Sequence, residues 1–391
     1  METPKLESLG IIKVESVHWY VHDMERTRRF YTELMDFAEL GESSPDLTKR
    51  GRQHSVVFNA NDVTLICSAP VGEGGRAWRW LRKHPEGVGT INYLVKDVEK
   101  TFKLLEERGG TIIDDAIQRF TDDKGGKLAF FSITTPFGNT TFRFIQRDGY
   151  EALYPGFVAH PTPKGGKNKF GFAKIDHITS NFRTLKPMVL WMKHVMGFEE
   201  FWNIAFHTEE EISKGDQHGT GLKSTVMWDP QSTVKFANNE PSRPRFKQSQ
   251  INVYVEDQRG EGVQHLALIV KDIVGTVRAM RATNGLDFLN TPGSYYDYLP
   301  ERLEKGGIKR IDENIQDLRD LQILIDGHKE HQYMLQIFMK ENSQLLKDRE
   351  SGPFFYEIIQ RKGDKGFGGG NFKALFESIE RAQAAERAAG R

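Results

Sequence analysis

The chain has 391 residues, with 54 basic and 54 acidic side chains and a formal net charge of zero. This balance gives no electrostatic reason to expect nucleic acid or an anionic membrane as a partner. The composition is ordinary for a globular protein, and no run approaches the roughly 18 apolar residues of a transmembrane helix. Because the N-terminus has no apolar signal region and Cys67 is the single cysteine, we expect a soluble, cytoplasmic protein of two or three domains.

A strand followed by an amphipathic helix is expected at Glu15–Met24 and Glu25–Phe37. The same order returns at Thr90–Gly110, Ile175–Phe198 and His265–Gly285, each time ending near a glycine. Short strand candidates lie between these copies: QHSVVFN, DVTLICSA, KLAFFSI and TFRFIQR in the first half, and STVMWD, YMLQIFM and FYEIIQR in the second. The sequence therefore predicts an α+β protein of four strand-helix-strands modules, paired two and two.

A segment rich in proline and glycine separates the two halves, between Gly149 and Lys169. Its prolines and paired glycines should prevent regular structure, which suits a surface linker between domains. We therefore expect an N-terminal domain over residues 1–150, a linker over 151–170 and a C-terminal domain over 171–391.

Alignment of the two halves identifies the candidate functional residues. The repeated segment VKD places Thr90 of the first half where His265 stands in the second. The match of FRFIQRDG to YEIIQRKG likewise aligns Arg143 with Glu357, and the first strands align Ser16 with His177. Equivalent positions in tandem repeats face a common surface, so His177, His265 and Glu357 are expected to converge although they are far apart in sequence.

Two neutral imidazoles and one carboxylate form a nitrogen and oxygen ligand set. On one face of an octahedral ion they leave three positions open, as in non-haem Fe(II) oxygenases, but the same ligands could hold Zn(II) at a four-coordinate hydrolytic site. Glu357 lies in an apolar strand, where a carboxylate needs a cation, a metal or water. Any one of the three residues alone is more often an ordinary strand residue, and their coincidence with the repeat favours a metal site.

Glycines from Gly366 to Gly370 follow the strand that carries Glu357. This run is not a dinucleotide fingerprint, because it lacks the third glycine at the right spacing and a βαβ context. From Asn371 the apolar residues have helical spacing, which predicts a helix over residues 371–389. Such a stripe is typical of core packing, and a helix that closes an aromatic pocket would show the same pattern.

The segments GVQHLAL, LQIF and FFYEIIQRKGDKGFGGGNFKALFESIE together resemble the 4-hydroxyphenylpyruvate dioxygenase family of the vicinal oxygen chelate superfamily. DHITSNF, GLKS, NEP and SQI fall in the family's order, so the resemblance covers nearly the whole chain. It implies glyoxalase-like tandem βαβββ modules in two domains, each with a curved, open, barrel-like sheet, and a C-terminal helix that closes the active site. It also implies a metal-free N-terminal domain and one Fe(II) per chain, held by His177, His265 and Glu357.

The resemblance further implies a pocket of amides and phenylalanines. Amides can hold a phenol hydroxyl and a carboxylate without adding charge, and phenylalanines can sandwich a ring and exclude water. Gln264, Gln336 and Phe372 are expected to take part in catalysis, and Asn252 departs from the family by standing where a glutamine is expected. The implied substrate-binding residues are Ser224, Asn239, Gln250, Gln264, Gln336, Phe338, Phe355, Phe367 and Phe372.

The implied reaction converts 4-hydroxyphenylpyruvate, an aromatic 2-oxo acid, and O2 to homogentisate and CO2 in tyrosine catabolism, by oxidative decarboxylation, ring hydroxylation and side-chain migration. The family also implies a homo-oligomer, dimer or tetramer. A 4-hydroxymandelate synthase would share the substrate and the iron site, although a smaller aliphatic residue is expected there in place of Phe372. A Zn or Ni glyoxalase-like isomerase would leave the C-terminal motif unexplained, and a ligand-sequestering module would suit only the first half.

Overall fold

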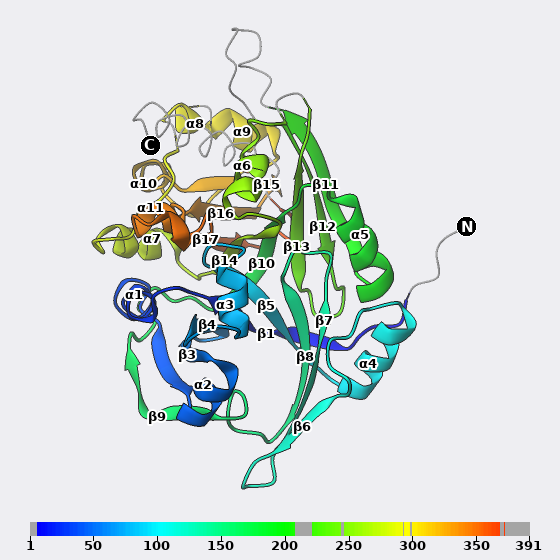
Figure 1. Ribbon diagram of the computed structural model, residues 1–391. Coiled ribbons are helices and arrows are strands. Elements are labelled where there is room, and N and C mark those ends of the chain that lie inside the picture. Colours follow the sequence, from blue (N-terminus) through cyan, green and yellow to red (C-terminus); the bar gives the residue numbers. More distant parts are fainter. Residues whose placement is uncertain are drawn as a thin grey trace.

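Two mixed β-sheets, one from each half of the chain, form the framework of the computed structural model (Figure 1). The first sheet has nine strands and the second has eight. In Figure 1 the first sheet occupies the lower part of the view and the second the upper part, with helices along their flanks. The structure describes residues 6–207, 221–243, 246–291, 293–297, 299–367 and 371.

In the N-terminal half, β1 and β5 pair antiparallel at the centre, and each has a parallel neighbour on its other side. The strand order is β6-β7-β8-β5-β1-β4-β3-β2-β9. The strands are β1 (Ile11–Tyr20), β2 (Ala38–Ser43), β3 (Gln53–Ala60), β4 (Val63–Pro70), β5 (Gly87–Val95), β6 (Gln118–Thr121), β7 (Lys127–Thr134), β8 (Thr141–Asp148) and β9 (Phe157–Gly165).

The C-terminal half repeats this arrangement, with β10 and β14 antiparallel at the centre and β13 and β17 as their parallel neighbours. The strand order is β11-β12-β13-β10-β14-β17-β16-β15. The strands are β10 (Lys174–Asn181), β11 (Glu199–His207), β12 (Gly221–Trp228), β13 (Lys235–Pro241), β14 (Gly262–Ile269), β15 (Leu324–Lys329), β16 (Gln332–Phe338) and β17 (Phe355–Lys362).

A helix follows each central strand, so the predicted α+β fold of four paired modules is confirmed. Helices α1 and α5 both continue into a π-helical turn, Phe30–Leu34 and Met192–Met196. The described helices are α1 (Met24–Arg29), α2 (Pro45–Gly51), α3 (Arg76–Leu81), α4 (Val98–Glu107), α5 (Lys186–Trp191), α6 (Gln250–Asp257), α7 (Ile273–Arg281), α8 (Ser294–Asp297), α9 (Leu299–Lys305), α10 (Ile315–Leu321) and α11 (Asn342–Leu345).

The repeated VKD and IQR segments perform the same local task in both halves. The aspartate of VKD is the N-cap of the following helix: Asp97 accepts from the Lys100 amide, and Asp272 from the Gly275 amide, both at 3.0 Å. The side-chain oxygen of the IQR glutamine accepts a hydrogen bond from the first backbone amide of the same helix, at 2.9 Å in both halves. These two motifs therefore dock each helix onto its sheet. The second pair of contacts joins Gln146 to Val98 and Gln360 to Ile273.

A shared hydrophobic core joins the two sheets. Side chains alternate along a strand, so one face of each central strand is apolar and the other carries polar residues. Within this core the Trp19 and Phe354 rings meet edge to face at 4.3 Å, and the hydroxyls of Tyr31 and Tyr356 are 2.9 Å apart. The two polar faces point away from this core, and the candidate site lies on one of them. Cys67 is fully buried in the core.

The expectation of irregular structure between the halves is wrong for Phe157–Gly165, which forms β9. This strand pairs antiparallel with β2 at the edge of the first sheet. Its register jumps from Lys164 to Ala159, and the bulge contains Pro161 and Pro163. Edge strands and bulges tolerate proline because the missing amide hydrogen is not needed for pairing there. The domain limits given above stay predictions.

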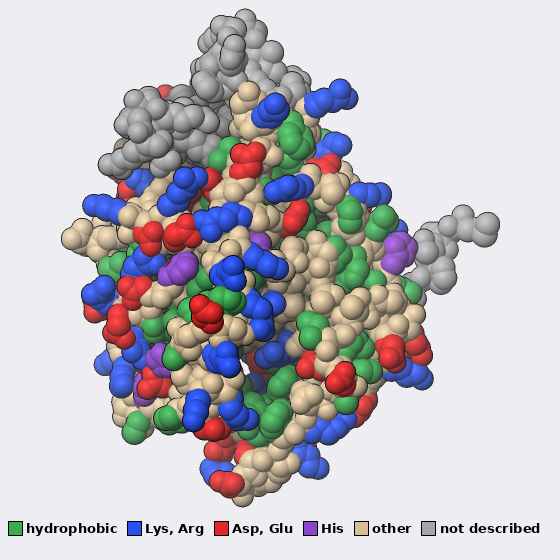
Figure 2. Space-filling model, in the orientation of Figure 1, with side chains coloured by type: hydrophobic (Ala, Val, Ile, Leu, Met, Phe, Trp, Pro, Cys, Tyr) green, Lys and Arg blue, Asp and Glu red, His purple; other side chains and the backbone are tan. Residues whose placement is uncertain are grey.

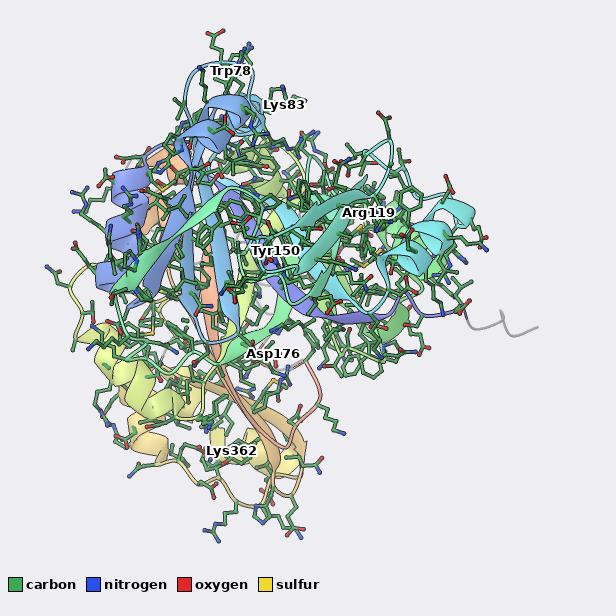
Figure 3. All side chains as sticks on the ribbon, turned by 90° about the horizontal axis from the view of Figure 1, so that it is seen from below. Trp78, Lys83, Arg119, Tyr150, Asp176 and Lys362 are labelled. Carbon is green, nitrogen blue, oxygen red and sulfur yellow. The ribbon has the colours of Figure 1, made fainter. Side chains whose placement is uncertain are left out.

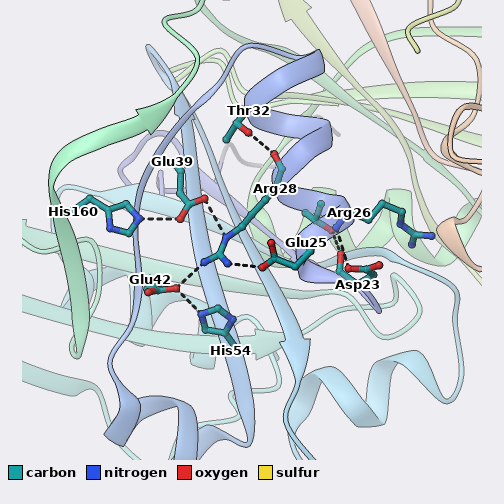
Figure 4. Close-up of polar contacts among 10 residues, drawn as sticks. Asp23, Glu25, Arg26, Arg28, Thr32, Glu39, Glu42, His54 and His160 are labelled. Atoms are coloured by element: carbon teal, nitrogen blue, oxygen red, sulfur yellow. Dashed lines mark hydrogen bonds and ion pairs between the residues drawn. The ribbon is translucent and has the colours of Figure 1, made fainter. Parts of the chain in front are cut away.

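Side-chain contacts hold β9 onto the first half (Figure 4). His160 of β9 lies 2.9 Å from the Glu39 carboxylate of β2. Arg28 from α1 contacts the other oxygen of Glu39 at 3.2 Å and also Glu42 at 2.8 Å, and His54 reaches Glu42 from β3. The segment that leads out of the first half is thus tied to α1, β2 and β3.

Among the described residues, no helix combines the length and the apolar character that a membrane span requires. Of the predicted helix over residues 371–389, Asn371 is helical and buried, and the remainder lies outside the described residues.

Candidate functional site

The structure brings His177, His265 and Glu357 together on the polar face of the second sheet. Each offers a ligand atom, and these atoms all lie within 4.8 Å of one another. The side chains come from the neighbouring strands β10, β14 and β17, and all three are almost completely buried, with 4%, 2% and 1% of their surface exposed. The Nε2 atoms of both histidines face the same Glu357 oxygen, at 3.2 and 3.3 Å.

Strand register confirms the alignment of the two halves at these positions. In the second half His265 pairs with Thr179 across β10, and Ala267 pairs with His177 and Glu357. In the first half the equivalent residue Asn92 pairs with Ser16 and Arg143. The pairs that occupy equivalent places are therefore Ser16 and His177, Thr90 and His265, Arg143 and Glu357.

The charges of the site favour an ionised carboxylate. Burial alone would raise the pKa of Glu357, but the charge and hydrogen bonds of His177 and His265 lower it to about 2. Burial lowers the pKa of His265, which outweighs the opposite effect of Glu357. The Nδ1 atom of His265 is buried and has no hydrogen-bond partner among the described residues.

A β-bulge positions the group behind His177. Ile175 pairs with Leu268 of β14, and His177 pairs with the adjacent residue Ala267. Asp176 has no partner on β14 and is therefore the extra residue of the bulge. Its carboxylate lies 2.9 Å from Nδ1 of His177 and accepts two 2.7 Å contacts from the Arg361 guanidinium. Burial would raise the pKa of Asp176, but Arg361 and His177 hold it well below its usual range. Figure 3 shows Asp176 near the middle of the projection, between Tyr150 and Lys362.

These contacts orient His177 so that Nδ1 meets a carboxylate and Nε2 faces the site. A histidine whose other ring nitrogen is bound by a carboxylate is a common arrangement around metals, because the partner fixes the tautomer and the ring plane. The buried set of two imidazole nitrogens and a carboxylate oxygen, all aimed at one point, fits a divalent transition metal such as Fe(II) or Zn(II).

Gln336 supports the carboxylate from β16. Its side-chain amide donates to Oε1 of Glu357 at 2.8 Å and contacts the Asn371 amide at 2.9 Å. Asn371 in turn contacts the hydroxyl of Tyr295 at 3.0 Å. This chain of contacts connects Glu357 to the first residue of the predicted closing helix. The role predicted for Phe372 lies outside the described residues.

Three predicted aromatic residues surround the histidines. Phe355 stacks on His265 with ring centres 4.9 Å apart, and Phe338 meets the same ring at 6.0 Å. Phe367 lies 4.7 Å from the His177 ring. These phenylalanines are all buried, so they form apolar walls around the imidazoles.

The predicted polar residues form two groups beside the histidines. Ser224 and Asn239 are directly paired across β12 and β13, and both are buried. Their atoms Oγ and Oδ1 have no hydrogen-bond partner among the described residues, which is unusual for buried polar groups and typical of a ligand-binding wall. Gln264 is the extra residue of a bulge in β14, and its amide donates to Gln250 of α6 at 3.2 Å.

Sequence reasoning missed three residues of this site. Asp176 and Arg361 form the ion pair behind His177, and Asn181 accepts from the Asn239 amide at 3.0 Å. Asn181 and Asp176 both lie in the segment DHITSNF, and Arg361 lies in the repeated IQR. The signal for the ion pair was the repeat itself, since Glu15 and Arg147 form the same pair in the first half.

Comparisons with known proteins agree with this geometry. Residues 13–141 match the family model described as the Glyoxalase/Bleomycin resistance protein/Dioxygenase superfamily. The chain is 32% identical over 389 residues to a 4-hydroxyphenylpyruvate dioxygenase of Coccidioides posadasii, covering 95% of this chain and 92% of that one. It is 34% identical to the protein of that name from Yarrowia lipolytica, with the same coverage.

A solved structure supports the fold. A mutant of 4-hydroxymandelate synthase from Streptomyces coelicolor superimposes with a TM-score of 0.78 over 96% of this chain and 99% of that one, at 24% identity. At this identity the match speaks for the architecture alone. The sequence identity of the fungal relatives is higher and extends over nearly the whole of each chain, which shows that this chain belongs to the 4-hydroxyphenylpyruvate dioxygenase family.

Proposed function

We propose that this protein is an Fe(II)-dependent dioxygenase that converts 4-hydroxyphenylpyruvate and O2 to homogentisate and CO2, a step of tyrosine catabolism. The convergence of His177, His265 and Glu357 in the C-terminal half is the observation that carries the proposal. Family membership supports the substrate and the reaction, because the similarity to relatives named 4-hydroxyphenylpyruvate dioxygenase extends over nearly their whole length.

The three buried side chains would hold the metal through two Nε2 atoms and one carboxylate. When bound, Fe(II) supplies the electron transfer and O2 chemistry that no amino-acid side chain provides. Asp176 keeps the His177 ring in the tautomer that presents Nε2 to the site. Gln336 donates a hydrogen bond to Oε1 of Glu357, and the other carboxylate oxygen, Oε2, faces the two histidines.

The remaining pocket residues would bind and orient the aromatic 2-oxo acid. Oγ of Ser224 and Oδ1 of Asn239, which have no hydrogen-bond partner among the described residues, offer hydrogen bonds to the polar groups of the substrate. Gln250 and Gln264 provide further amides at the α6 side. Phe338, Phe355 and Phe367 form apolar walls that can hold the ring and exclude water, which protects a reactive oxidant. We assign Phe372 to the same wall on the resemblance alone.

The experiment is a turnover assay with the purified protein, Fe(II), ascorbate and 4-hydroxyphenylpyruvate in air. O2 uptake would be followed with an electrode, and the product identified by chromatography and mass spectrometry. Homogentisate is the expected product. 4-Hydroxymandelate would instead support the second candidate, a synthase, which the structural likeness to such an enzyme brings into consideration. No O2 uptake with iron demonstrably bound would contradict both.

The identity of the metal and the assembly state need separate measurements. Anaerobic titration should give one Fe(II) per chain, and activity with Zn(II) in its place would contradict the iron assignment. Light scattering would test the proposed homo-oligomer, dimer or tetramer. Subcellular fractionation would test the cytoplasmic location.

A further inference from the structure

The polar face of the first sheet encloses a cavity of its own. Its volume is about 280 Å³, and it lies between α2 and the strands β6, β7 and β8. Figure 2 shows a hollow in this region, with Lys and Arg side chains around it and hydrophobic side chains inside. A volume of this size holds roughly nine water molecules at liquid density, or one small single-ring molecule.

A half-buried cation that forms no ion pair with the described residues lies at this cavity. Arg143, the counterpart of Glu357, donates from Nε to Ser132 at 3.1 Å and lies over the Phe130 ring at 4.8 Å. No carboxylate of the described residues is within ion-pair distance of Arg143. Glu15, the one acid among the described residues that line the cavity, is already paired with Arg147. A guanidinium that is partly withdrawn from water and has no ion-pair partner among the described residues loses hydration without a compensating charge, so this position is suited to an anion supplied from outside.

Further polar groups of the cavity wall have no hydrogen-bond partner within the described part of the chain. The Tyr154 hydroxyl and Oδ1 of Asn92 are buried and make no hydrogen bond to the described residues. Burial raises the pKa of Tyr154, so its hydroxyl stays protonated and can donate. His18 is neutral at physiological pH, because burial, Arg143 and Arg76 lower its pKa to about 3. Arg50 and Arg147 also line the cavity, but each is paired with a carboxylate, so Arg143 is the one guanidinium of the wall that has no ion-pair partner among the described residues. Neutral hydrogen-bonding groups surround it.

Apolar side chains form a large part of the wall. Ile66, Leu128, Phe120, Phe130 and Ile145 line the cavity from β4, β6, β7 and β8. A mineral anion would leave this surface in contact with water, whereas an organic acid would cover it with its hydrocarbon part. One charge and an extensive apolar wall together select a monocarboxylate with an aromatic or similarly compact apolar body.

Cations also surround the approach to the cavity. A shallow depression shares Arg50 and Gln53 with the cavity and is further lined by Arg52, Arg76 and Arg79. Trp78 and Lys83, which continue this basic segment, lie at the periphery of the molecule in Figure 3. A concentration of one sign of charge at a cavity mouth raises the local concentration of oppositely charged ligands.

We propose that the N-terminal half is a second binding site, which takes a small aromatic monocarboxylate with its carboxylate against Arg143 and its ring against Phe130 and Leu128. This site is separate from the His177, His265 and Glu357 centre and does not depend on the function proposed for it. The two positions are structural equivalents, so the same place in the repeat serves metal binding in one half and anion binding in the other.

Isothermal titration calorimetry of the full-length protein tests this site, with phenylacetate as the probe and phenylacetamide as its uncharged analogue. Phenylacetate should bind, and phenylacetamide should bind at least about tenfold more weakly, because it lacks the charge-assisted hydrogen bond to Arg143. Equal affinity for the two compounds, tighter binding of inorganic phosphate, or no binding of phenylacetate at millimolar concentration would each overturn the proposal.

Two variants separate this site from the catalytic one. Arg143→Gln should weaken phenylacetate binding at least about tenfold, whereas Arg29→Gln removes the same charge from an exposed position of the same half and should change nothing. Ile66→Phe keeps Arg143 but fills the cavity, and it should also weaken binding. Binding that survives both cavity variants, in protein whose thermal unfolding is unchanged, would place the carboxylate elsewhere and refute the assignment.

Discussion

The two halves of this protein share one framework and differ in what stands on it. In both halves an acidic residue directly precedes Ser16 or its counterpart His177. It is the extra residue of a β-bulge and forms an ion pair with the arginine of the IQR segment. These pairs are Glu15 with Arg147 and Asp176 with Arg361. The aligned positions themselves carry Ser16, Thr90 and Arg143 in one half, and His177, His265 and Glu357 in the other. The framework thus does not decide the chemistry, which depends on three side chains.

The neighbours of Arg143 and of its counterpart Glu357 differ in accordance with the charge of each side chain. Glu357 accepts from Gln336, whereas Arg143 lies over Phe130, which occupies the corresponding place on β7. A carboxylate needs donors and a guanidinium is stabilised by an aromatic face, so each half has neighbours suited to the sign of its charge.

The largest effect is expected from Glu357→Gln, which removes the charged ligand but keeps the shape of the side chain. Partners behind metal ligands are worth about 10- to 100-fold, so loss of a ligand should reduce turnover and iron affinity by more than about 100-fold. Iron content after gel filtration and O2 uptake would measure this. The counterpart substitution Arg143→Gln should leave iron affinity and turnover within about twofold of the parent values. Full activity of Glu357→Gln would refute the ligand assignment.

A smaller loss, about 10- to 100-fold in metal affinity, is expected for Asp176→Asn. The amide would no longer hold Nδ1 of His177 by a charge-assisted contact, so the ring would lose its fixed tautomer. Glu15→Gln is the matched control, because it weakens the equivalent ion pair in the half without histidine ligands. Competition titration with a chelator gives both affinities, and equal effects of the two substitutions would show that Asp176 acts only on folding.

The first half should lose stability in mild acid because of His18. Its pKa in the folded protein is about 3, below its usual value of 6.5, so the unfolded chain binds a proton in this window and the folded chain does not. The free energy of unfolding should therefore fall as the pH is lowered from 6.5 towards 3. His18 lines a cavity that solvent reaches, so we expect a contribution of about 1 kcal/mol between pH 7 and pH 5.

Urea unfolding of the parent protein and of His18→Asn at these two pH values measures that contribution. The variant has no titrating group at this position and should lose about 1 kcal/mol less on acidification. Identical pH dependence of the two proteins would mean that folding does not lower the pKa of His18.

The smallest effect concerns the contact between the halves. Tyr31 of the first half and Tyr356 of the second join through a buried hydrogen bond of 2.9 Å. A double-mutant cycle with Tyr31→Phe and Tyr356→Phe should give a coupling energy of roughly 0.5 to 1 kcal/mol in unfolding experiments. Additive effects of the two changes would indicate that the hydroxyls do not stabilise the interface.

Much of the framework could be predicted from the sequence. Strand alternation and helical periodicity are local patterns, so the four modules and most of their strands were expected at the observed places. The repeats VKD and IQR also identified the aligned positions, because they cap and dock the same helix in each half. His177, His265 and Glu357 were therefore expected together before any distance was known.

Only the tertiary structure decided the features that depend on partners distant in the sequence. β9 is a strand despite its prolines because the free edge of β2 and the contacts of His160 hold it there. The bulges that carry Asp176 and Glu15, and the pairing of Asn181 with Asn239, follow from strand register, which packing sets. The periodicity of the sequence indicates which face of a strand carries a given side chain. The register between strands in the folded sheets determines which other side chains it contacts.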